Sequence, residues 1–212
     1  MKYDYLVLDF NGTIIDDVDL CLNILNHLLE ERNYKKVSLE EYKHIFTFPI
    51  KKYYINAGFD LEKYSFTSIS REFISLYQKA SLNCKLYEGI NEIIDKCNNN
   101  RIKVVLLSAS QIDNLKEQTD HFGLSEKFEA ILGTSTIEAA SKVESGKNYF
   151  KDKQDKKILF VGDTTHDAEV ASAIGADALL ITHGHQARDI LLKANPLKVI
   201  DSFKEVEDIL GI

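Results

Sequence analysis

The chain has 212 residues, of which 44% are hydrophobic, so it is long enough to bury a sizeable core, and disorder is not expected. Its formal net charge of −7 repels nucleic acid and anionic lipid surfaces, and neither partner is predicted. Cys21, Cys84 and Cys97 are odd in number and lack C-x-x-C spacing, which argues against a disulfide framework or a thiolate zinc site. Because no run approaches the ~18 apolar residues of a spanning helix, a reducing, cytoplasmic location is expected.

Taken in chain order, the hydrophobic pattern predicts an α/β fold. Five short apolar runs are typical of buried parallel strands: residues 3–8, 103–107, 129–132, 158–161 and 178–181. Helical patterns at residues 112–122 and 168–174 separate the later runs. This alternation indicates a Rossmann-like parallel sheet flanked by helices.

The first half of the chain follows a different pattern. Between Asp9 and Lys103 no strand-like run occurs, and the i, i+3, i+4 spacing of amphipathic helices appears at residues 19–31, 39–46, 51–56 and 69–80. We therefore expect a small all-helical insertion after the first strand, with boundaries near Asp16 and Leu82. The expected division is an α/β core of residues 1–15 and 83–212, and an insertion of residues 16–82, which we call the cap.

The strongest chemical signal follows the first strand, in Leu8-Asp9-Phe10-Asn11-Gly12-Thr13. Ligands of parallel sheets bind outside the carboxyl ends of the strands, so Asp9 is expected to project into a binding crevice. An Asx-type turn after a strand is the simpler structural explanation.

A second acidic cluster, Gly162-Asp163-Thr164-Thr165-His166-Asp167, follows the fourth predicted strand in the same way. Asp163 and Asp167 would lie near Asp9 if the two strands are neighbours. A few carboxylate ligands with room for water suit Mg²⁺ better than zinc. Asp167 could also simply complement the dipole of the helix that starts there.

A hydroxyl group and a lysine complete the set. Ser108, in Leu107-Ser108-Ala109-Ser110, is expected between a strand and a helix N-terminus, where a hydroxyl and free amides can bind phosphate. Ser110 could be no more than an N-cap. Lys142 is expected at a helix start, where a cation opposes the helix dipole and needs solvent or an anionic partner. Lys147 is the competing candidate.

The order of these residues resembles the haloacid dehalogenase-like phosphohydrolases over essentially the whole chain, in the helical-cap subgroup that includes phosphoglycolate phosphatase. The matching positions are Asp9-Phe10-Asn11-Gly12-Thr13, Ser108, Lys142 and Gly162-Asp163 through Asp167. The resemblance implies that Asp9 is a nucleophile that forms an aspartyl-phosphate, which water then hydrolyses.

The resemblance also implies a role for each remaining matched residue. Mg²⁺ would be held by Asp9, the backbone carbonyl of Asn11, Asp163 and, directly or through water, Asp167. The phosphoryl oxygens would be bound by Ser108, the Ala109 amide, Lys142 and Gly12, and Thr13 would brace the loop. Asp9, Asn11 and Lys142 form the expected catalytic set.

Asn11 departs from the family pattern, which usually has a second Asp there. That carboxyl protonates the leaving alkoxide and later activates water, and an amide can do neither. Such help is typically worth ~10²–10⁴-fold in rate, so its loss favours substrates with good leaving groups. Three explanations stay open: another group such as His166 or a cap residue moves the proton, the residue was introduced to slow turnover, or catalysis has been lost.

Several basic residues could also approach the site. His183 and His185 follow the last core strand and could line its entrance, and Lys51, Lys52 and Arg71 of the cap could meet a distal anionic group of the substrate when the cap closes. A cap lysine that forms an imine would instead favour phosphonate cleavage.

The leading hypothesis is a Mg²⁺-dependent phosphatase of a small phosphorylated metabolite. The alternative is a catalytically impaired protein that binds such a metabolite without efficient turnover. The sequence leaves open the physiological substrate and the choice between monomer and homodimer.

Overall fold

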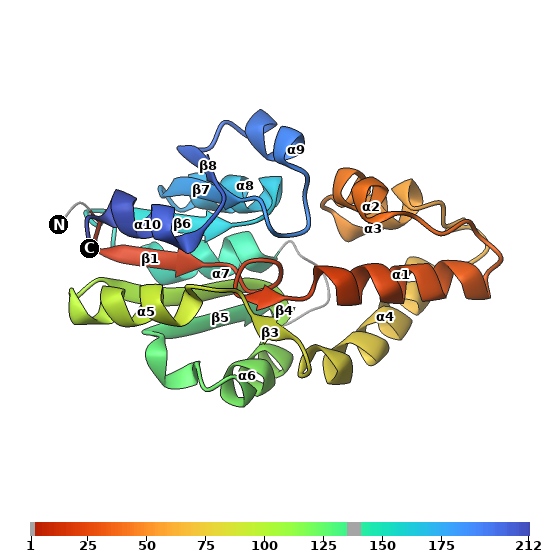
Figure 1. Cartoon of the computed structure of the whole chain (residues 1–212), viewed down its shortest axis with the longest axis horizontal. Helices are drawn as coiled ribbons and strands as arrows, with labels where there is room; N and C mark the ends of the chain where they lie inside the picture. The colour runs from red at the N-terminus through yellow and green to blue at the C-terminus, as the bar shows by residue number, and fades with distance from the viewer. Residues whose placement is uncertain (1–2, 135–140) are drawn as a thin grey trace.

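In the computed structural model, which describes residues 3–134 and 141–212, six of the described strands form a parallel sheet of order β5-β4-β1-β6-β7-β8. The central strand β1 pairs on one side with β4 and on the other with β6 (Figure 1). The strands are β1 (Tyr5–Leu8), β4 (Lys103–Gln111), β5 (Ala130–Thr134), β6 (Ile158–Gly162), β7 (Asp177–Ile181) and β8 (Lys198–Ile200).

Helices cover both faces of the sheet. Alternate strand residues face opposite sides, so Leu6 and Leu8 pack under one layer of helices while Tyr5 and Val7 pack under the other. The first layer is α5 (Ile90–Asn99), α6 (Ile112–His121) and α10 (Phe203–Leu210), and the second is α7 (Ser141–Phe150), α8 (Thr165–Ala173) and α9 (Arg188–Lys193). A short 3-10 turn, η1 (Ser125–Lys127), follows α6. This confirms the predicted Rossmann-like fold.

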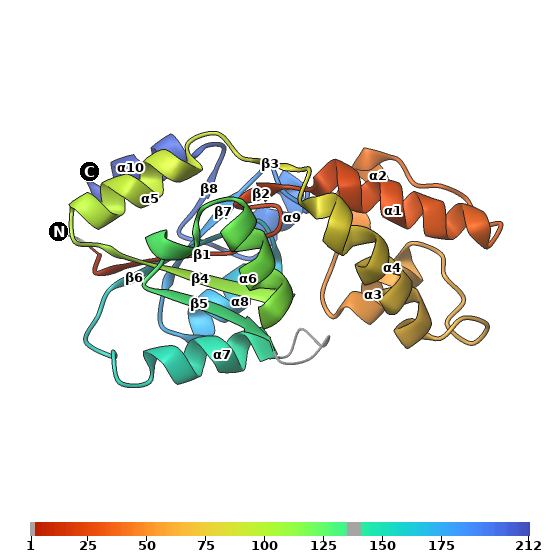
Figure 2. The same ribbon diagram turned by 90° about the horizontal axis from the view of Figure 1, so that it is seen from below.

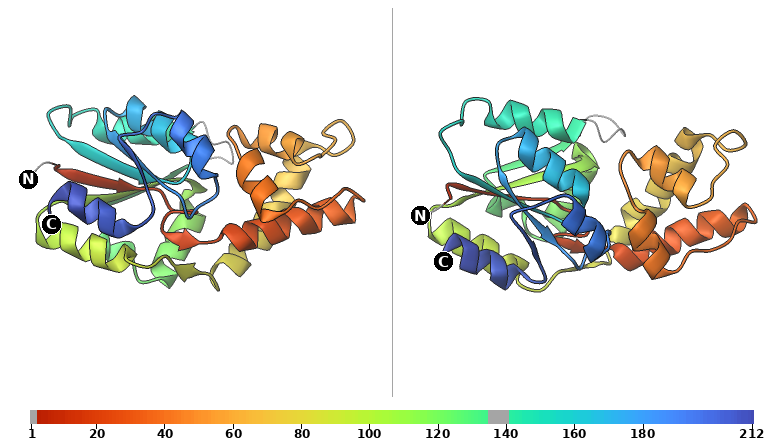
Figure 3. Two further views of the ribbon diagram at one scale, coloured as in Figure 1. Left: turned by 45° about the horizontal axis from the view of Figure 1, so that its top comes forward. Right: turned by 90° about the horizontal axis from the view of Figure 1, so that it is seen from above.

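The predicted helical insertion after the first strand is also confirmed. Four helices lie together beyond the carboxyl ends of the strands, as Figures 1 and 2 show: α1 (Val18–Glu31), α2 (Leu39–Ile45), α3 (Ile50–Asn56) and α4 (Phe66–Ser81). They share a hydrophobic cluster of their own, which includes Leu25, Leu29, Tyr42, Tyr54 and Ile69. The two views of Figure 3 show the same four helices projecting from one end of the sheet.

The chain enters and leaves the helical insertion through a two-stranded antiparallel ribbon. Its strands are β2 (Ile15–Asp16) and β3 (Lys85–Leu86), with Ile15 opposite Leu86. These short strands and β8 are absent from the sequence prediction, because two or three residues carry too little pattern to be recognised.

Among the described residues, no helix is long and apolar enough to cross a membrane.

Candidate active site

The sheet order brings the predicted site residues together. In β1, Leu8 lies beside Leu106 of β4 and Val161 of β6, so the three strands end at the same edge. Asp9 follows β1 and Asp163 follows β6. Ser108 lies in β4, two residues beyond Leu106, where the pairing of β4 with β1 ends. The juxtaposition expected from the sequence therefore occurs, and it occurs at the end of the sheet that faces the helical insertion.

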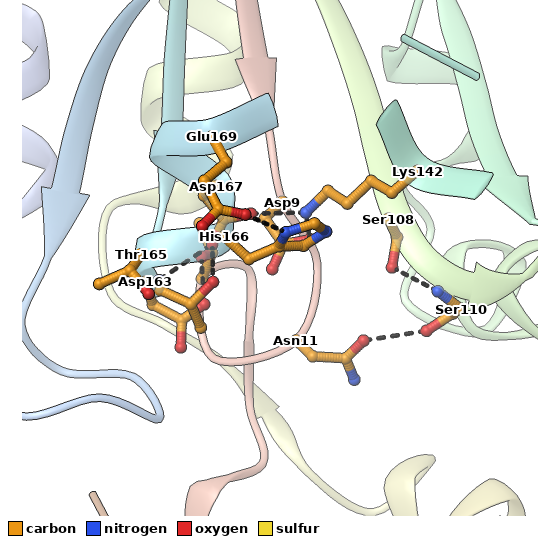
Figure 4. A network of polar contacts seen from close by, with 12 residues as sticks. Asp9, Asn11, Ser108, Ser110, Lys142, Asp163, Thr165, His166, Asp167 and Glu169 are labelled. Carbon is orange, nitrogen blue, oxygen red and sulfur yellow. Dashed lines mark hydrogen bonds and ion pairs between the residues drawn. The ribbon is translucent and has the colours of Figure 1, made fainter. Parts of the chain in front are cut away.

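Lys142 reaches this edge from the first turn of α7. Its Nζ atom lies 2.6 Å from an oxygen of Asp9 and 2.6 Å from an oxygen of Asp167, and the lysine side chain is 2% exposed (Figure 4). Burial alone would lower the pKa of Lys142, but the two carboxylates outweigh it and raise the pKa. Lys142 is thus a fixed cation, whereas the competing Lys147 is exposed at the protein surface.

One ammonium group does not neutralise the three carboxylates. Burial and the nearby charges of Asp167 and Asp163 raise the pKa of Asp9 to about 8, although Lys142 opposes the shift. Burial and Asp167 also raise the pKa of Asp163 to about 6, against the opposing effect of His185. For Asp167, burial is outweighed by Lys142, and its pKa is lowered. The folded site therefore carries an excess of negative charge.

Oxygen atoms of Asp9, Asp163 and Asp167 lie within 4.8 Å of one another and could hold a metal ion. Hard oxygen ligands such as these carboxylates are the kind that Mg²⁺ prefers. Asp17, Cys21 and His185 form a second such group. There, Asp17 already pairs with His185 at 3.2 Å, and burial raises the pKa of the Cys21 thiol.

Asn11 is held at both ends of its amide. Its Oδ1 atom accepts a hydrogen bond from Ser110 at 3.0 Å, and its Nδ2 atom donates to Asp17 at 2.9 Å and to Tyr77 at 2.6 Å. Tyr77 in turn donates to Asp17 at 2.7 Å. Asp17 is fully buried and accepts hydrogen bonds, so a donor at position 11, such as the amide of Asn11, suits this site.

Gly12 and Thr13 shape the loop after β1. The Gly12 amide donates to Asp17 at 2.8 Å, so this N–H is engaged within the protein, and the expected contact of Gly12 with a phosphate group stays a prediction. Gly12 has φ +67, and an added Cβ would lie 2.4 Å from an oxygen of Asp163, so only glycine fits there. Thr13 donates to Asp163 at 3.2 Å, in line with the bracing role that the sequence suggested.

The surroundings of Ser108 differ from the prediction. The strand β4 continues to Gln111, and the following helix begins at Ile112 with Gln111 as its N-cap. Ser108 and Ala109 therefore lie on the strand rather than at a helix N-terminus, and Ser110 is not the cap. A register shift between Leu107 and Gln111 accounts for the difference, because this irregularity lets the strand continue through polar residues. The buried Ser108 hydroxyl accepts a hydrogen bond from the Ser110 amide at 3.1 Å.

The remaining histidines, lysines and arginine that the sequence placed near the site lie in different parts of the structure. His166 stacks on Phe48 with ring centroids 4.5 Å apart, and its Nδ1 atom lies 3.1 Å from Glu169. His183 stacks on Tyr87 with ring centroids 3.6 Å apart and does not line the cavity described below. Lys51, Lys52 and Arg71 are exposed, and they too lie outside the described lining of that cavity.

A buried polar network around His185 was missed by the sequence reasoning. The Nε2 atom of His185 lies 3.2 Å from Asp17, its Nδ1 atom lies 2.7 Å from the Tyr42 hydroxyl, and its backbone N–H donates to Asp163 at 2.6 Å. Burial would lower the pKa of His185, but Asp17 outweighs it and raises the pKa. The sequence analysis named His185 as a residue that could line the entrance of the site, and His185 does line the cavity described below, but its partners Asp17 and Tyr42 were not predicted.

A cavity of about 460 Å³ lies between the sheet edge and the helical insertion. Asp9, Ser108, Lys142 and Asp163 line one end of it. Aromatic residues of α2 to α4 and of the segment between α2 and α3 line much of the rest of it. Its volume falls in the range of small-molecule sites, so a substrate could extend from Asp9 toward the helices.

Comparison with known proteins agrees with this geometry. The model of the haloacid dehalogenase-like hydrolase family matches residues 6–181. A phosphoglycolate phosphatase of Synechococcus elongatus is 21% identical over 204 residues, which cover 90% of this chain and 89% of the relative.

Solved structures share the fold across the whole chain. A haloacid dehalogenase-like family hydrolase of Streptococcus pneumoniae has a TM-score of 0.83 at 15% identity and covers 99% of both chains. Protein Tyrosine Kinase A of Mycobacterium tuberculosis has a TM-score of 0.82 at 19% identity, covering 100% of this chain and 99% of that one. Because the family model spans most of the sequence, this chain belongs to the haloacid dehalogenase-like hydrolase family.

Proposed function

We propose that this protein is a Mg²⁺-dependent phosphatase of small phosphomonoesters that forms an aspartyl-phosphate on Asp9. The observation that carries the proposal is the position of Asp9: it lies at the carboxyl edge of the sheet, is bonded to Lys142 at 2.6 Å, and opens onto a cavity large enough for a small ester. The relationship to phosphoglycolate phosphatases supports the same reaction class.

In this proposal Asp9 attacks phosphorus, and the bond between phosphorus and the leaving oxygen breaks. Lys142 and the Ser108 hydroxyl, together with the Ala109 amide, stabilise the phosphoryl oxygens as charge develops on them. Lys142 also fixes Asp9 in place, because the same ammonium group bonds to Asp9 and Asp167. Water then attacks phosphorus of the aspartyl-phosphate, which releases phosphate and restores the carboxylate.

The residues that would hold Mg²⁺ are Asp9, the Asn11 backbone carbonyl, Asp163 and Asp167, the last directly or through water. The excess negative charge around Asp9 and Asp163 supports this assignment, since a divalent cation would offset it. When bound, the ion supplies the positive charge that lets a carboxylate approach a phosphate group.

We also propose that residues 16–82 act as a cap over a core of residues 1–15 and 83–212. The separate hydrophobic cluster of the four helices and the narrow β2–β3 connection support this division. Closure of such a cap would exclude water from the site before phosphoryl transfer. No lysine of the described cap residues lines the cavity, which argues against the imine chemistry of phosphonate cleavage.

The runner-up function is a phosphometabolite-binding protein with inefficient turnover. Asn11 is the observation that favours it, because an amide cannot protonate the leaving group. Unaltered ligand binding with no measurable release of phosphate would select this alternative.

The test is phosphate release from acetyl phosphate, p-nitrophenyl phosphate and a panel of alkyl phosphomonoesters, with Mg²⁺ or with EDTA. Asp9→Asn serves as the inactive variant, and Asp208→Asn, which changes an exposed carboxylate of α10, serves as its matched control. We expect release that needs both Mg²⁺ and Asp9. Release that persists in Asp9→Asn would contradict the proposal.

A further inference from the structure

The distal end of the cavity has the character of a binding site for a ring. This end is lined by α3 and α4 and is mostly apolar and aromatic, with Tyr53, Tyr54, Phe66 and Phe73 among its residues. These side chains pack against one another and their neighbours: Phe46 lies 5.0 Å from Tyr53 between ring centroids, and Phe73 stacks on Tyr77 at 6.1 Å. Rings that are already packed present fixed faces, so an inserted aromatic group would lose little freedom on meeting them.

The same end of the cavity lacks a partner for an anionic group. Among the described residues that line it, Lys142 is the only Lys or Arg, and it is already bonded to Asp9 and Asp167 at the reaction end. His185 is engaged by Asp17 and Tyr42. Residues 135–140, with the sequence Ser-Thr-Ile-Glu-Ala-Ala, contain no basic side chain. A carboxylate on the leaving group would thus meet no free cationic side chain there, only hydroxyl groups such as those of Ser70 and Tyr53, and burying a charge without an opposite charge is costly.

Asn11 restricts the leaving group independently of the cavity, because an amide cannot protonate the leaving oxygen. The amide is bonded to Ser110, Asp17 and Tyr77, and it has no acidic proton to give. Asn11 therefore gives no proton to the leaving oxygen, which favours a leaving group that can depart as an anion. A phenolate is tolerable because a phenol has a pKa of about 10, whereas an alkoxide is a far stronger base, comparable to the hydroxide of water with pKa about 15.7.

We propose that the substrate is an aryl phosphomonoester with an uncharged ring, so that the leaving group is a phenol. This inference rests on the proposed function and names its substrate class. Asp9 forms a bond to phosphorus as the bond between phosphorus and the aryl oxygen breaks, and the electron pair leaves on the phenolate, which takes its proton from water. Hydrolysis of the aspartyl-phosphate consumes one water molecule, and the products are the phenol and inorganic phosphate.

The test compares kcat/KM for four compounds with Mg²⁺: acetyl phosphate, phenyl phosphate, 4-carboxyphenyl phosphate and phosphoglycolate. We expect phenyl phosphate to exceed phosphoglycolate by ~10²–10⁴-fold, the range that a missing general acid sets. We expect 4-carboxyphenyl phosphate to fall at least about tenfold below phenyl phosphate, because its carboxylate meets no cation.

A pair of variants on α4 locates the ring. Phe73→Ala should lower kcat/KM for phenyl phosphate by about tenfold relative to kcat/KM for acetyl phosphate, because one aromatic contact with the ring is lost. Leu76→Ala, which changes a side chain 41% exposed on the same helix, should keep that ratio.

Two results would overturn this inference while leaving the proposed function intact. In the first, acetyl phosphate is hydrolysed but kcat/KM for phosphoglycolate equals or exceeds that for phenyl phosphate. In the second, Phe73→Ala leaves the ratio of kcat/KM for phenyl phosphate to that for acetyl phosphate unchanged. Loss of Asp9-dependent release from all four compounds would overturn the proposed function as well. The acetyl phosphate measurement separates these cases, because that small activated compound needs neither the ring site nor a general acid.

Discussion

At the scale of single residues, Asn11 determines which reactions this site can perform. Its amide lies between a hydroxyl donor, Ser110, and the buried carboxylate of Asp17. An aspartate in its place would bring a second carboxyl group to Asp17, and two such groups cannot both ionise at hydrogen-bond distance. The introduced carboxyl group would keep a proton, which is what a general acid needs.

Asn11→Asp should therefore raise kcat for alkyl phosphomonoesters by ~10²–10⁴-fold. The increase should be much smaller for phenyl phosphate, whose leaving group needs no proton. Steady-state kinetics with both substrates would measure this, with Asn11→Ala as the variant that loses the amide without gaining an acid. Equal alkyl phosphatase rates for Asn11→Asp and the unaltered protein would count against the assigned role of this position.

Asp9 illustrates the conflict between function and stability. Its pKa is raised to about 8 by burial and by Asp167 and Asp163, above the ~3.9 of an unfolded Asp. The folded protein therefore binds the proton more tightly than the unfolded chain, and stability is lost as pH rises between these two values. At pH 8 the ionised Asp9 destabilises the metal-free fold.

Asp9→Asn should melt at a higher temperature than the unaltered protein in EDTA at pH 8, by ~2–4 °C for each kcal/mol of relieved repulsion. The difference should shrink at pH 5, where Asp9 is protonated, and also with Mg²⁺, which offsets the charge of the native site. Thermal unfolding at both pH values checks this expectation. A lower melting temperature for Asp9→Asn at pH 8 in EDTA would refute it.

At the scale of elements, the sequence patterns located the four cap helices, α6, α8 and most of the longer strands, but they missed α5 and α9 and misplaced the end of β4. Residues 158–161 and 178–181 are apolar on both faces, so β6 and β7 could be recognised from composition alone. In β4 the pattern stops at Leu107 because the strand continues through polar residues that line the site. The residue types at the end of β4 follow from their place at the site rather than from burial, so the predicted end of the strand, Leu107, fell four residues short of Gln111.

The segment after β7 carries a pH-sensitive group, His183. Burial lowers its pKa to about 4, compared with about 6.5 in an unfolded chain. Between these values the unfolded chain takes up a proton that the folded protein excludes. The contribution of His183 to stability is therefore present above pH 6.5 and is lost as pH falls toward 4.

His183→Phe keeps an aromatic ring against Tyr87 and removes this titration. Between pH 7 and pH 5 the unaltered protein should lose about 2 kcal/mol of unfolding free energy relative to the variant. Urea unfolding of both proteins at the two pH values would measure the difference, and His121→Phe, which changes a histidine of the exposed C-terminal turn of α6, serves as the control. Parallel pH dependence of His183→Phe and the unaltered protein would contradict the assignment.

At the scale of the whole molecule, parallel topology explains why so much of the site could be expected from sequence. Asp9 and Asp163 follow β1 and β6, and Ser108 lies in the last part of β4. Because these three strands lie side by side, knowing the strand order suffices to bring the residues together. Lys142 could be separated from Lys147 only by the structure, because both belong to one helix and their burial depends on how that helix docks.

The network of Asp17, His185 and Tyr42 was beyond sequence reasoning for a related reason. Tyr42 lies on a cap helix and His185 in the segment after β7, and their contact depends on how the cap sits over the sheet. The aromatic cavity has the same origin: its rings follow an ordinary amphipathic pattern, which cannot show whether an apolar face meets protein or substrate.

The central claim is that Asp9 becomes phosphorylated, and the most direct measurement is mass spectrometry of protein mixed with phenyl phosphate and Mg²⁺ and then quenched in acid. Because Asn11 cannot activate water, the aspartyl-phosphate should accumulate before it is hydrolysed. We predict one phosphoryl group per chain, carried by the peptide that contains Asp9 and absent from Asp9→Asn. Steady release of phosphate with no phosphorylated protein, or a phosphoryl group on another residue, would contradict the account.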